Sequence, residues 1–486
     1  MMETLEQQLA GLSPEQRQLV ERLLRKEQPE SELRPAAQKA VTGPAPLLPS
    51  QRWFLDQAYD HLVNPNRWNF SMMFEAPPGV PSGHLEQSIG HIFEYHDALR
   101  ARFDRDEQGW HQTIEPVGRA IPFTRIDLSG LSSAEQLAAV KQQASDAQSS
   151  LSIDQHRLTR FVLFDLGNQQ PARLLVVIHH LLTDVVSTTI VLQDLALAYL
   201  QLSQGQTIRL PAKTASLKEW AERLERQAQS EELQRALEDY WRSIPWDELH
   251  PLPVDHAQGR ERNTWGSLES VSLSLEIDET RTLLRLFPQR YRTPVATGLL
   301  FALVQTLTAW SGDRWACVSQ VDSGRHILPP PDTLDLSRTA GWLAMSGELI
   351  LQRIAVKTPA EALQSFAAQI NQIPYRGFGQ PIFSMSGKAD ATRKLGIFLK
   401  DEVVFDYWAQ VGSAEKQRPG PFRVLEDANE IRHHPENQRF RLLDCRFDLS
   451  GDRLRVNWRY SRNVHQRATI EKLAVGCVEI LRWLMG

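Results

Sequence analysis

Cysteine is scarce in this chain of 486 residues, which contains three: Cys317, Cys445 and Cys477. They are far apart and odd in number, so the sequence offers neither a disulfide framework nor a Cys-x-x-Cys site for a metal or for redox chemistry. Such cysteine usage fits a reducing compartment. We therefore predict a cytoplasmic protein without a metal site of this kind.

Positive charge is not in excess either. The chain has 54 Lys and Arg residues against 59 Asp and Glu, which gives a formal net charge of −5. Proteins that bind nucleic acid usually carry a basic face or a basic stretch. The sequence therefore argues against a nucleic-acid partner.

Long apolar runs are also missing. The first residues lack the basic segment and apolar run of a signal peptide, and no apolar stretch approaches the roughly 20 residues that cross a bilayer. With 42% hydrophobic and 23% charged residues, the composition is typical of a soluble globular enzyme of two or three domains. We predict a monomer that works away from membranes.

The pattern of apolar residues divides the chain into four parts. Residues 1–47 form a short helix (13–26) and a Pro-rich linker, 48–215 a first half, 216–250 a polar helical connector, and 251–486 a second half. The expected helices are 51–59, 85–102, 293–310 and 468–484, and the expected strands are 68–74, 161–164, 271–275, 316–321 and 454–458. Both halves are thus α/β, with a cleft between them as the natural place for a substrate.

The most informative segment runs from Leu174 to Asp184. Leu174–Ile178 is a continuous aliphatic run typical of a buried strand, and it ends in His179 and His180 before a helical pattern begins. Neighbouring residues of a strand point to opposite faces, so we expect His180 to face a cavity and His179 to face the packing behind it. A neutral imidazole can accept a proton near pH 7.

From this pair alone, a structural role is the more common one for buried histidines. A metal site is not favoured, because the two histidines lack the i, i+4 helical spacing of a zinc protease and no cysteine cluster accompanies them.

Four motifs, in order along the chain, resemble those of nonribosomal peptide synthetase condensation domains, a branch of the chloramphenicol-acetyltransferase-like superfamily. Residues 179–184 resemble the His-His-x-x-x-Asp-Gly motif, and 96–103 resemble His-x-x-Leu-Arg-x-x-Phe. Residues 323–325 resemble a Ser-Gly-Arg turn, and 340–342 a Val-Gly-x-Phe segment. The resemblance covers nearly the whole chain. It implies two chloramphenicol-acetyltransferase-like lobes in a V-shaped pseudo-dimer with a tunnel between them.

The resemblance also implies a function. Condensation domains join an acyl or aminoacyl thioester, held on the phosphopantetheine arm of a carrier protein, to an amine that is free or carried by a second carrier. His180 is then the catalytic residue, which hydrogen-bonds the attacking amine. His179, Asp184 and Arg325 support it, with Asp184 and Arg325 pairing across the two halves. The chain itself would bind no cofactor, and the carrier proteins would arrive as separate partners.

Other polar and aromatic residues in these motifs receive structural interpretations. His96 and Arg100 are interpreted as an ion-pairing face at the surface or between the halves. Trp53, Trp68 and Trp342 are predicted to anchor the core, as large aromatic residues usually do.

Six segments are similar to the epimerization branch of the same superfamily: residues 51–54, 64–69, 291–293, 337–342, 373–379 and 404–407. That branch carries a Glu in a Glu-Gly-His-Gly-Arg segment, whereas this chain has Val321 in the corresponding position. Valine cannot exchange a proton, and the adjacent Asp322 would point to the opposite face of the strand. Amide formation is therefore the leading hypothesis, and epimerization of a carrier-bound residue is the alternative.

A second departure is Val185, which stands where the motif has Gly. Glycine adopts positive φ at low cost or lets a substrate pass closely, and a β-branched residue does neither. We predict that Val185, Val321 and Ser323 shape the tunnel. The departures also motivate a third hypothesis, a catalytically silent platform that recruits a tailoring enzyme to a carrier protein.

Overall fold

The computed structural model describes residues 40–118, 120–328, 334–355, 358–387, 402–408, 421–425 and 431–486. The chain divides into residues 1–39 and residues 40–486, and the description concerns the second unit. The helix expected at 13–26 and most of the predicted linker lie outside the described residues.

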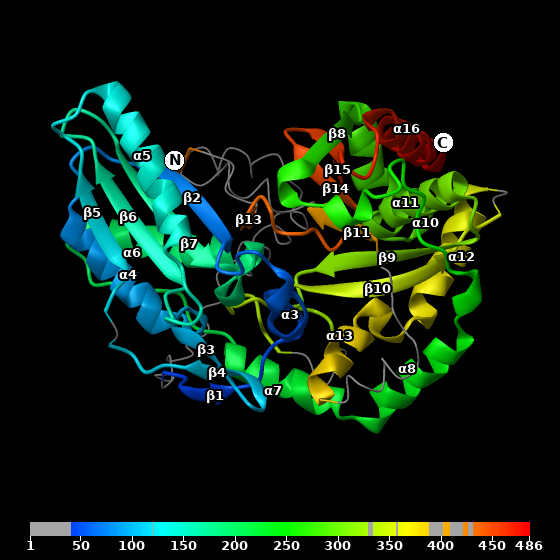
Figure 1. The fold of residues 1–486 in the computed structure, drawn as a ribbon, viewed down its shortest axis with the longest axis horizontal. Helices are drawn as coiled ribbons and strands as arrows, with labels where there is room; N and C mark the ends of the chain where they lie inside the picture. Colours follow the sequence, from blue (N-terminus) through cyan, green and yellow to red (C-terminus); the bar gives the residue numbers. More distant parts are fainter. Residues whose placement is uncertain are drawn as a thin grey trace, which may run out of the picture. The chain divides into compact units, whose positions relative to one another are not determined.

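The first sheet has the strand order β12-β2-β7-β6-β5, and β13 also pairs with β2. Its strands are β2 (Trp68–Ala76), β5 (Phe123–Asp127), β6 (Thr159–Asp165), β7 (Ala172–His179), β12 (Arg423–Val424) and β13 (Ile431–His433). Helix α5 (Ser133–Ser149) covers one face, while α4 (Ser82–Tyr95) and α6 (Val185–Ser203) cover the other (Figure 1). Because β7 is central and covered on both faces, its sequence is continuously aliphatic.

A small second sheet, β1 (Gly43–Ala45), β4 (Gly109–Ile114) and β3 (Ala101–Asp106), corrects one prediction. The helix expected at 85–102 ends at Tyr95, and β3 begins six residues later. Arg100 explains the break, because its Nη1 donates to the carbonyl oxygens of Phe93 (2.6 Å) and Glu94 (3.1 Å). These carbonyls at a helix C-terminus would otherwise lack partners.

The third sheet lies in the second half, with the order β10-β9-β11-β14-β15-β8. Its strands are β8 (Leu268–Ser274), β9 (Trp315–Asp322), β10 (Met345–Gln352), β11 (Val403–Trp408), β14 (Leu443–Ser450) and β15 (Arg453–Ser461). Helices α11 (Val295–Ser311), α12 (Pro359–Gln372) and α16 (Arg467–Met485) pack on one face and form a second core. The predicted strands and long helices of this half are present, with their ends shifted by a few residues.

The predicted helical connector contains two helices, α7 (Leu217–Ala228) and α8 (Glu231–Ser243). The chain breaks between them at Ser230, which caps the start of α8. The Ser230 hydroxyl accepts the Leu233 N–H at 3.2 Å. Shorter helices are α3 (Pro49–Trp53), α9 (Ile277–Arg281), α10 (Phe287–Tyr291) and α13 (Gly379–Phe383).

Late residues of the chain complete the first sheet. Strands β12 and β13 follow β11 in the sequence, yet they pair with β2, where Arg423 lies opposite Glu75 and His433 opposite Trp68. Figure 1 shows orange β13 close to blue β2. The two halves are therefore joined by strand pairing as well as by α7 and α8.

Helix α6 differs from a sequence expectation. By length and composition alone, α6 is long and apolar enough to cross a bilayer. No other unbroken helix in the described part of the chain meets this test. Its residues Ile190, Val191, Leu195 and Ala198 are buried in this structure. A core helix passes the same test, and the packing of α6 fits that interpretation.

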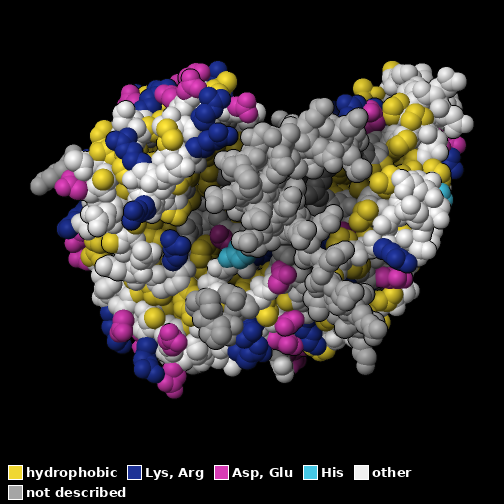
Figure 2. All heavy atoms as spheres, turned by 180° about the vertical axis from the view of Figure 1, so that it is seen from behind, with side chains coloured by type: hydrophobic (Ala, Val, Ile, Leu, Met, Phe, Trp, Pro, Cys, Tyr) yellow, Lys and Arg dark blue, Asp and Glu magenta, His cyan; other side chains and the backbone are white. Residues whose placement is uncertain are grey.

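The surface seen in Figure 2 carries both signs of charge. Lys and Arg side chains alternate with Asp and Glu over the described residues of this face, with hydrophobic side chains between them. This mixture agrees with the near-balanced composition.

Candidate active site

The paired histidines lie between a strand and a helix. Strand β7 ends at His179, residues His180–Leu182 form a single 3₁₀ turn, and α6 begins at Val185. Asp184 caps that helix, because its Oδ1 accepts the Ser187 N–H at 2.7 Å. The motif spacing thus fits a tight strand-to-helix connection.

His180 has a hydrogen bond at one ring nitrogen and, within the described part of the chain, none at the other. Its Nδ1 lies 2.7 Å from the carbonyl oxygen of Thr183, which can only accept, so Nδ1 carries the proton. In the neutral imidazole the lone pair is then on Nε2. Burial is the main cause that lowers the pKa of His180 from 6.5 to about 4. The side chain is therefore a neutral base at pH 7.

Aromatic side chains enclose the His180 ring. Trp342 stacks on it with a centroid distance of 3.9 Å and an angle of 26°, and Phe70 makes an edge contact at 4.9 Å. His180 is 6% exposed. Trp342, predicted only as a core anchor, is therefore a residue of the site itself, and the tunnel expected between the halves remains a prediction.

His179 has both nitrogens in use. Its Nδ1 accepts the Leu181 N–H at 3.1 Å, so Nε2 carries the proton and donates to the carbonyl oxygen of Pro65 at 3.1 Å. Burial lowers its pKa to about 3. His179 therefore fixes the loop, and no nitrogen is left to meet a substrate.

Asp184 joins the two halves. Its Oδ2 accepts from Arg325 Nη1 at 3.3 Å and from the backbone N–H groups of Leu343 (3.0 Å) and Ala344 (2.9 Å). Both charged side chains are almost completely buried, at 3% and 5% exposed. The contact predicted between Asp184 and Arg325 is present, and the two backbone donors add to it.

The turn after β9 aims Arg325 at this carboxylate. Gly324 has φ +73°, and a Cβ there would lie 1.8 Å from the carbonyl oxygen of Leu343, so only glycine fits. The carbonyl of Ser323 accepts from Arg325 Nη1 at 2.9 Å, while Arg325 Nη2 donates to Ser187 Oγ at 2.9 Å. Ser323 thus contributes through its backbone.

Val185 and Val321, which depart from the family motifs, lie in regular secondary structure. Val185 is the first residue of α6 and is not among the non-glycine residues with positive φ, so the freedom of a glycine is not needed there. Val321 lies near the end of β9, 37% exposed, opposite Ser346 on β10. Their predicted role in shaping a tunnel remains a proposal.

The interpretation of His96 and Arg100 as an ion-pairing face at the surface or between the halves is wrong about the surface, while the contacts of His96 reach the second half. Both are buried, at 3% and 5% exposed. His96 Nε2 lies 2.9 Å from Asp194 of α6, which also pairs with Arg338 of the second half. The sequence shows a charged residue, Asp194, in the middle of a helical pattern, but it does not show which residues Asp194 contacts.

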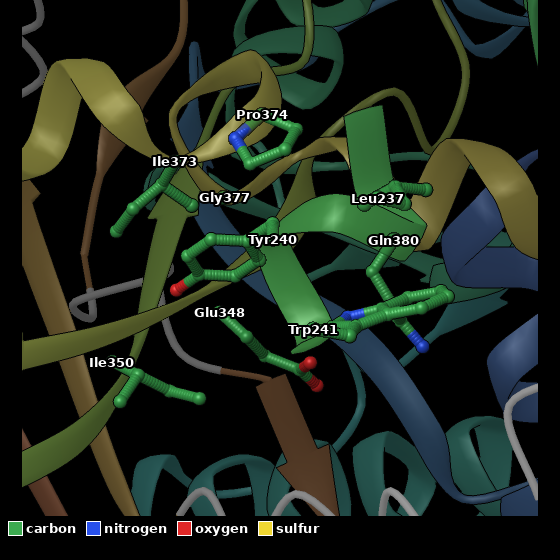
Figure 3. Close-up of a pocket in the computed structure, with 9 residues that line it drawn as sticks. All are labelled: Leu237, Tyr240, Trp241, Glu348, Ile350, Ile373, Pro374, Gly377 and Gln380. Carbon is green, nitrogen blue, oxygen red and sulfur yellow. The ribbon is translucent and has the colours of Figure 1, made fainter. Parts of the chain in front are cut away.

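Two cavities in the described part of the chain are not lined by His180. One, of about 10 Å³, is bounded by Tyr240 and Trp241 of α8 and by Glu348 and Ile350 of β10 (Figure 3), and it is too small for a ligand. The other, of about 470 Å³, is lined by parts of α4, the segment after β4, and β6, and it reaches Leu182 of the histidine turn. Its volume suits a small molecule.

The lowered pKa values of His179 and His180 predict how stability depends on pH. Both are near 6.5 when unfolded but about 3 and about 4 when folded, so below pH 6.5 the unfolded chain binds protons that the folded chain does not. Acid therefore favours unfolding, by a slope approaching about 1.4 kcal/mol per pH unit for each histidine. Urea unfolding at pH 7, 6 and 5 measures this trend. A free energy of unfolding that stays level or rises as the pH falls from 7 to 5 would contradict this prediction.

Comparison with known proteins places this geometry in a family. The family model described as "Condensation domain" matches residues 41–485, and the chain belongs to this family of nonribosomal peptide synthetase domains. One component of the linear gramicidin synthase of Brevibacillus parabrevis is 36% identical over 454 residues, which cover 93% of this chain but 6% of that protein. The chain thus spans a small fraction of the length of such curated relatives.

Solved structures show the same fold. The epimerization domain from the third module of tyrocidine synthetase B has a TM-score of 0.78 and 26% identity, and the match covers 92% of this chain and 98% of that one. The first condensation domain of the calcium-dependent antibiotic synthetase has a TM-score of 0.61 and 17% identity, with 92% and 96% covered. The predicted chloramphenicol-acetyltransferase-like α/β fold and the family resemblance are therefore confirmed.

Proposed function

We propose that the chain forms an amide bond between an acyl or aminoacyl thioester on a carrier protein and an amine. The observation that carries the proposal is the buried, neutral His180, whose Nε2 has a lone pair while Nδ1 is fixed on Thr183. As the amine nitrogen bonds to the thioester carbonyl carbon, Nε2 accepts the amine proton. The C–S bond then breaks, and the proton passes to the leaving thiolate.

The surroundings of His180 suit this role. Trp342 and Phe70 cover much of the ring, which is 6% exposed, and the contacts of Asp184 hold the turn in one place. Much of the rate would come from holding two tethered reactants together. Carrier proteins would bring the phosphopantetheine arm, the chain would bind no cofactor of its own, and it would act as a cytoplasmic monomer.

Product formation tests this proposal directly. The chain is incubated with a carrier protein loaded with an acyl or aminoacyl thioester and with candidate amines, free or carrier-bound, and products are followed by mass spectrometry. We expect an amide that forms faster than in the same mixture with heat-unfolded chain. Equal rates across a broad panel of donors and amines would refute amide formation.

Epimerization is a second candidate, and the similarity to the tyrocidine epimerization domain favours it, at 26% identity against 17% for the condensation domain. It requires the removal of an α-proton and the return of a proton from the other face, which needs two opposed groups or one mobile group. His180 supplies one of them, and Val321 cannot supply the other. Incorporation of solvent deuterium at the α-carbon tests this candidate.

A further inference from the structure

One row of residues crosses four strands of the second-half sheet. Ser346 of β10 lies opposite Val321 of β9, and Asp406 of β11 lies opposite Arg446 of β14. The pairing of the parallel strands β9 and β11 ends at Phe405 and Gln320, and Asp406 and Val321 are the residues that directly follow this last pair. We call these four residues the Asp406 row.

The row projects away from the helical core. Val403 and Phe405 of β11 are buried in the core made with α11 and α16, as is Val318 of β9. Side chains alternate along a strand, so Asp406 and Val321 both point to the opposite face of the sheet. The carboxyl group of Asp406 therefore lies on the same face of the sheet as the valine that lacks a proton to exchange.

The same end of the sheet is bonded to the histidine turn. Strand β9 runs into the turn that carries Arg325, which contacts Asp184 at 3.3 Å. Strand β10 starts directly after Leu343 and Ala344, whose N–H groups donate to Asp184. In Figure 1 these ends of β9 and β10 point toward the first half. Of the Asp406 row, Ser346 thus lies two residues after Ala344, and Val321 lies four residues before Arg325.

Asp406 has the surroundings of an acid that can hold a proton. Its side chain is 16% exposed, and Arg446 Nε lies 3.4 Å from its Oδ2. Burial raises the pKa of the Asp406 carboxyl, against the opposing effects of Arg446 and Trp408. A carboxyl group with a pKa raised by burial next to a charged partner is a candidate functional group, although structural ion pairs can shift a pKa as well.

We propose that Asp406 and His180 form a proton-transfer pair that inverts the α-carbon of a carrier-bound aminoacyl thioester. His180 Nε2 takes the α-proton, and the electron pair of the C–H bond moves into the thioester as an enolate. The protonated Asp406 then gives its proton to the other face of the α-carbon. The site is left with an imidazolium and a carboxylate, which exchange protons with water. This step goes beyond amide formation and rests on the second candidate function.

The experiment measures inversion and deuterium incorporation in D₂O for both enantiomers of a carrier-bound aminoacyl thioester. We compare wild type, Asp406→Asn and His180→Ala. Asp448→Asn is the matched control, because Asp448 is on the adjacent strand β14, on the same face, and is paired with Arg455 at 2.7 Å. Asp406→Glu keeps the carboxyl group, and circular dichroism checks folding of each variant.

The wild type is expected to exchange and invert both enantiomers, and Asp448→Asn to stay within a few-fold of it. Asp406→Asn should lose inversion by at least about 100-fold. It should still exchange one enantiomer with retention, through His180, whereas His180→Ala should lose that exchange. Asp406→Glu should recover part of the inversion, because it keeps the carboxyl group. This variant tests the role of the carboxyl group even if Asp406→Asn does not fold properly.

Wild-type inversion in Asp406→Asn, or equal loss of exchange from both enantiomers in that folded variant, would overturn the pair. Absence of exchange in the wild type would overturn it too. Amide formation in the separate assay would then still support the first proposal, so the two failures are distinguishable.

Discussion

Replacement of Asp184 by alanine is expected to lower the free energy of unfolding by roughly 3–5 kcal/mol, because it leaves the buried Arg325 guanidinium without its counterion. The N–H groups of Ser187, Leu343 and Ala344 lose their acceptor as well. Asp184→Asn keeps an acceptor oxygen but loses the charge, so its effect should be smaller. Denaturant unfolding at pH 7 measures both variants.

A surface ion pair provides the control. Asp60 pairs with Arg105 at 3.0 Å, and both side chains are at least half exposed. Asp60→Asn should change the unfolding free energy little, since exposed pairs contribute little. If Asp184→Ala were no more destabilising than Asp60→Asn, the contacts across the two halves would not hold the histidine turn as we infer.

Replacement of His180 by alanine should reduce turnover by about 10²–10⁴-fold, the usual contribution of a positioned acid or base. Because the pKa is about 4, the imidazole stays neutral down to that pH, and protonation of His180 should not limit turnover between pH 8 and 5. Initial rates of amide formation and of α-proton exchange across this range measure both effects.

His111→Ala is the matched control, because His111 is exposed and bonded to Asp106 at 2.8 Å on the small sheet. It should retain wild-type turnover. If His180→Ala also retained wild-type turnover with every substrate pair, neither proton-transfer role would hold. A reduced rate at low pH with a midpoint near 6.5 would show instead that the working base is not this buried imidazole.

The local part of the site follows from the sequence. An aliphatic run and two histidines before a helical pattern predict a strand that ends ahead of a helix, and the structure has both elements. The short turn between them and the cap that Asp184 makes on α6 were not predicted. The periodicity also located β2 and β6 in the first half and β8, β9 and β15 in the second, but not β10, β11 or β14. The predicted features depend on residues that are neighbours in the chain, which is why pattern and propensity suffice for them.

The remainder of the site depends on distant residues. Trp342 reaches His180 from the second half, and the partners of Asp184 at 343 and 344 are 159 and 160 residues away from it. The sequence pattern predicts that Trp342 is buried in a core, but it does not predict that Trp342 stacks on the ring of His180. The pairing of β9 with β11, which brings Asp406 to the face of the sheet that carries Val321, is likewise a property of the folded sheet, because β9 and β11 are separated by β10 and α12 in the sequence.

The pairing of β12 and β13 with β2 has a consequence for synthesis on the ribosome. Arg423 and Glu75, which bond across this pairing, are 348 residues apart. Until the late segment has been made, one edge of β2 presents unpaired amide and carbonyl groups, which invite association with other chains. A nascent chain halted anywhere before residue 421 would therefore carry an open strand edge, and chaperone binding should concentrate there.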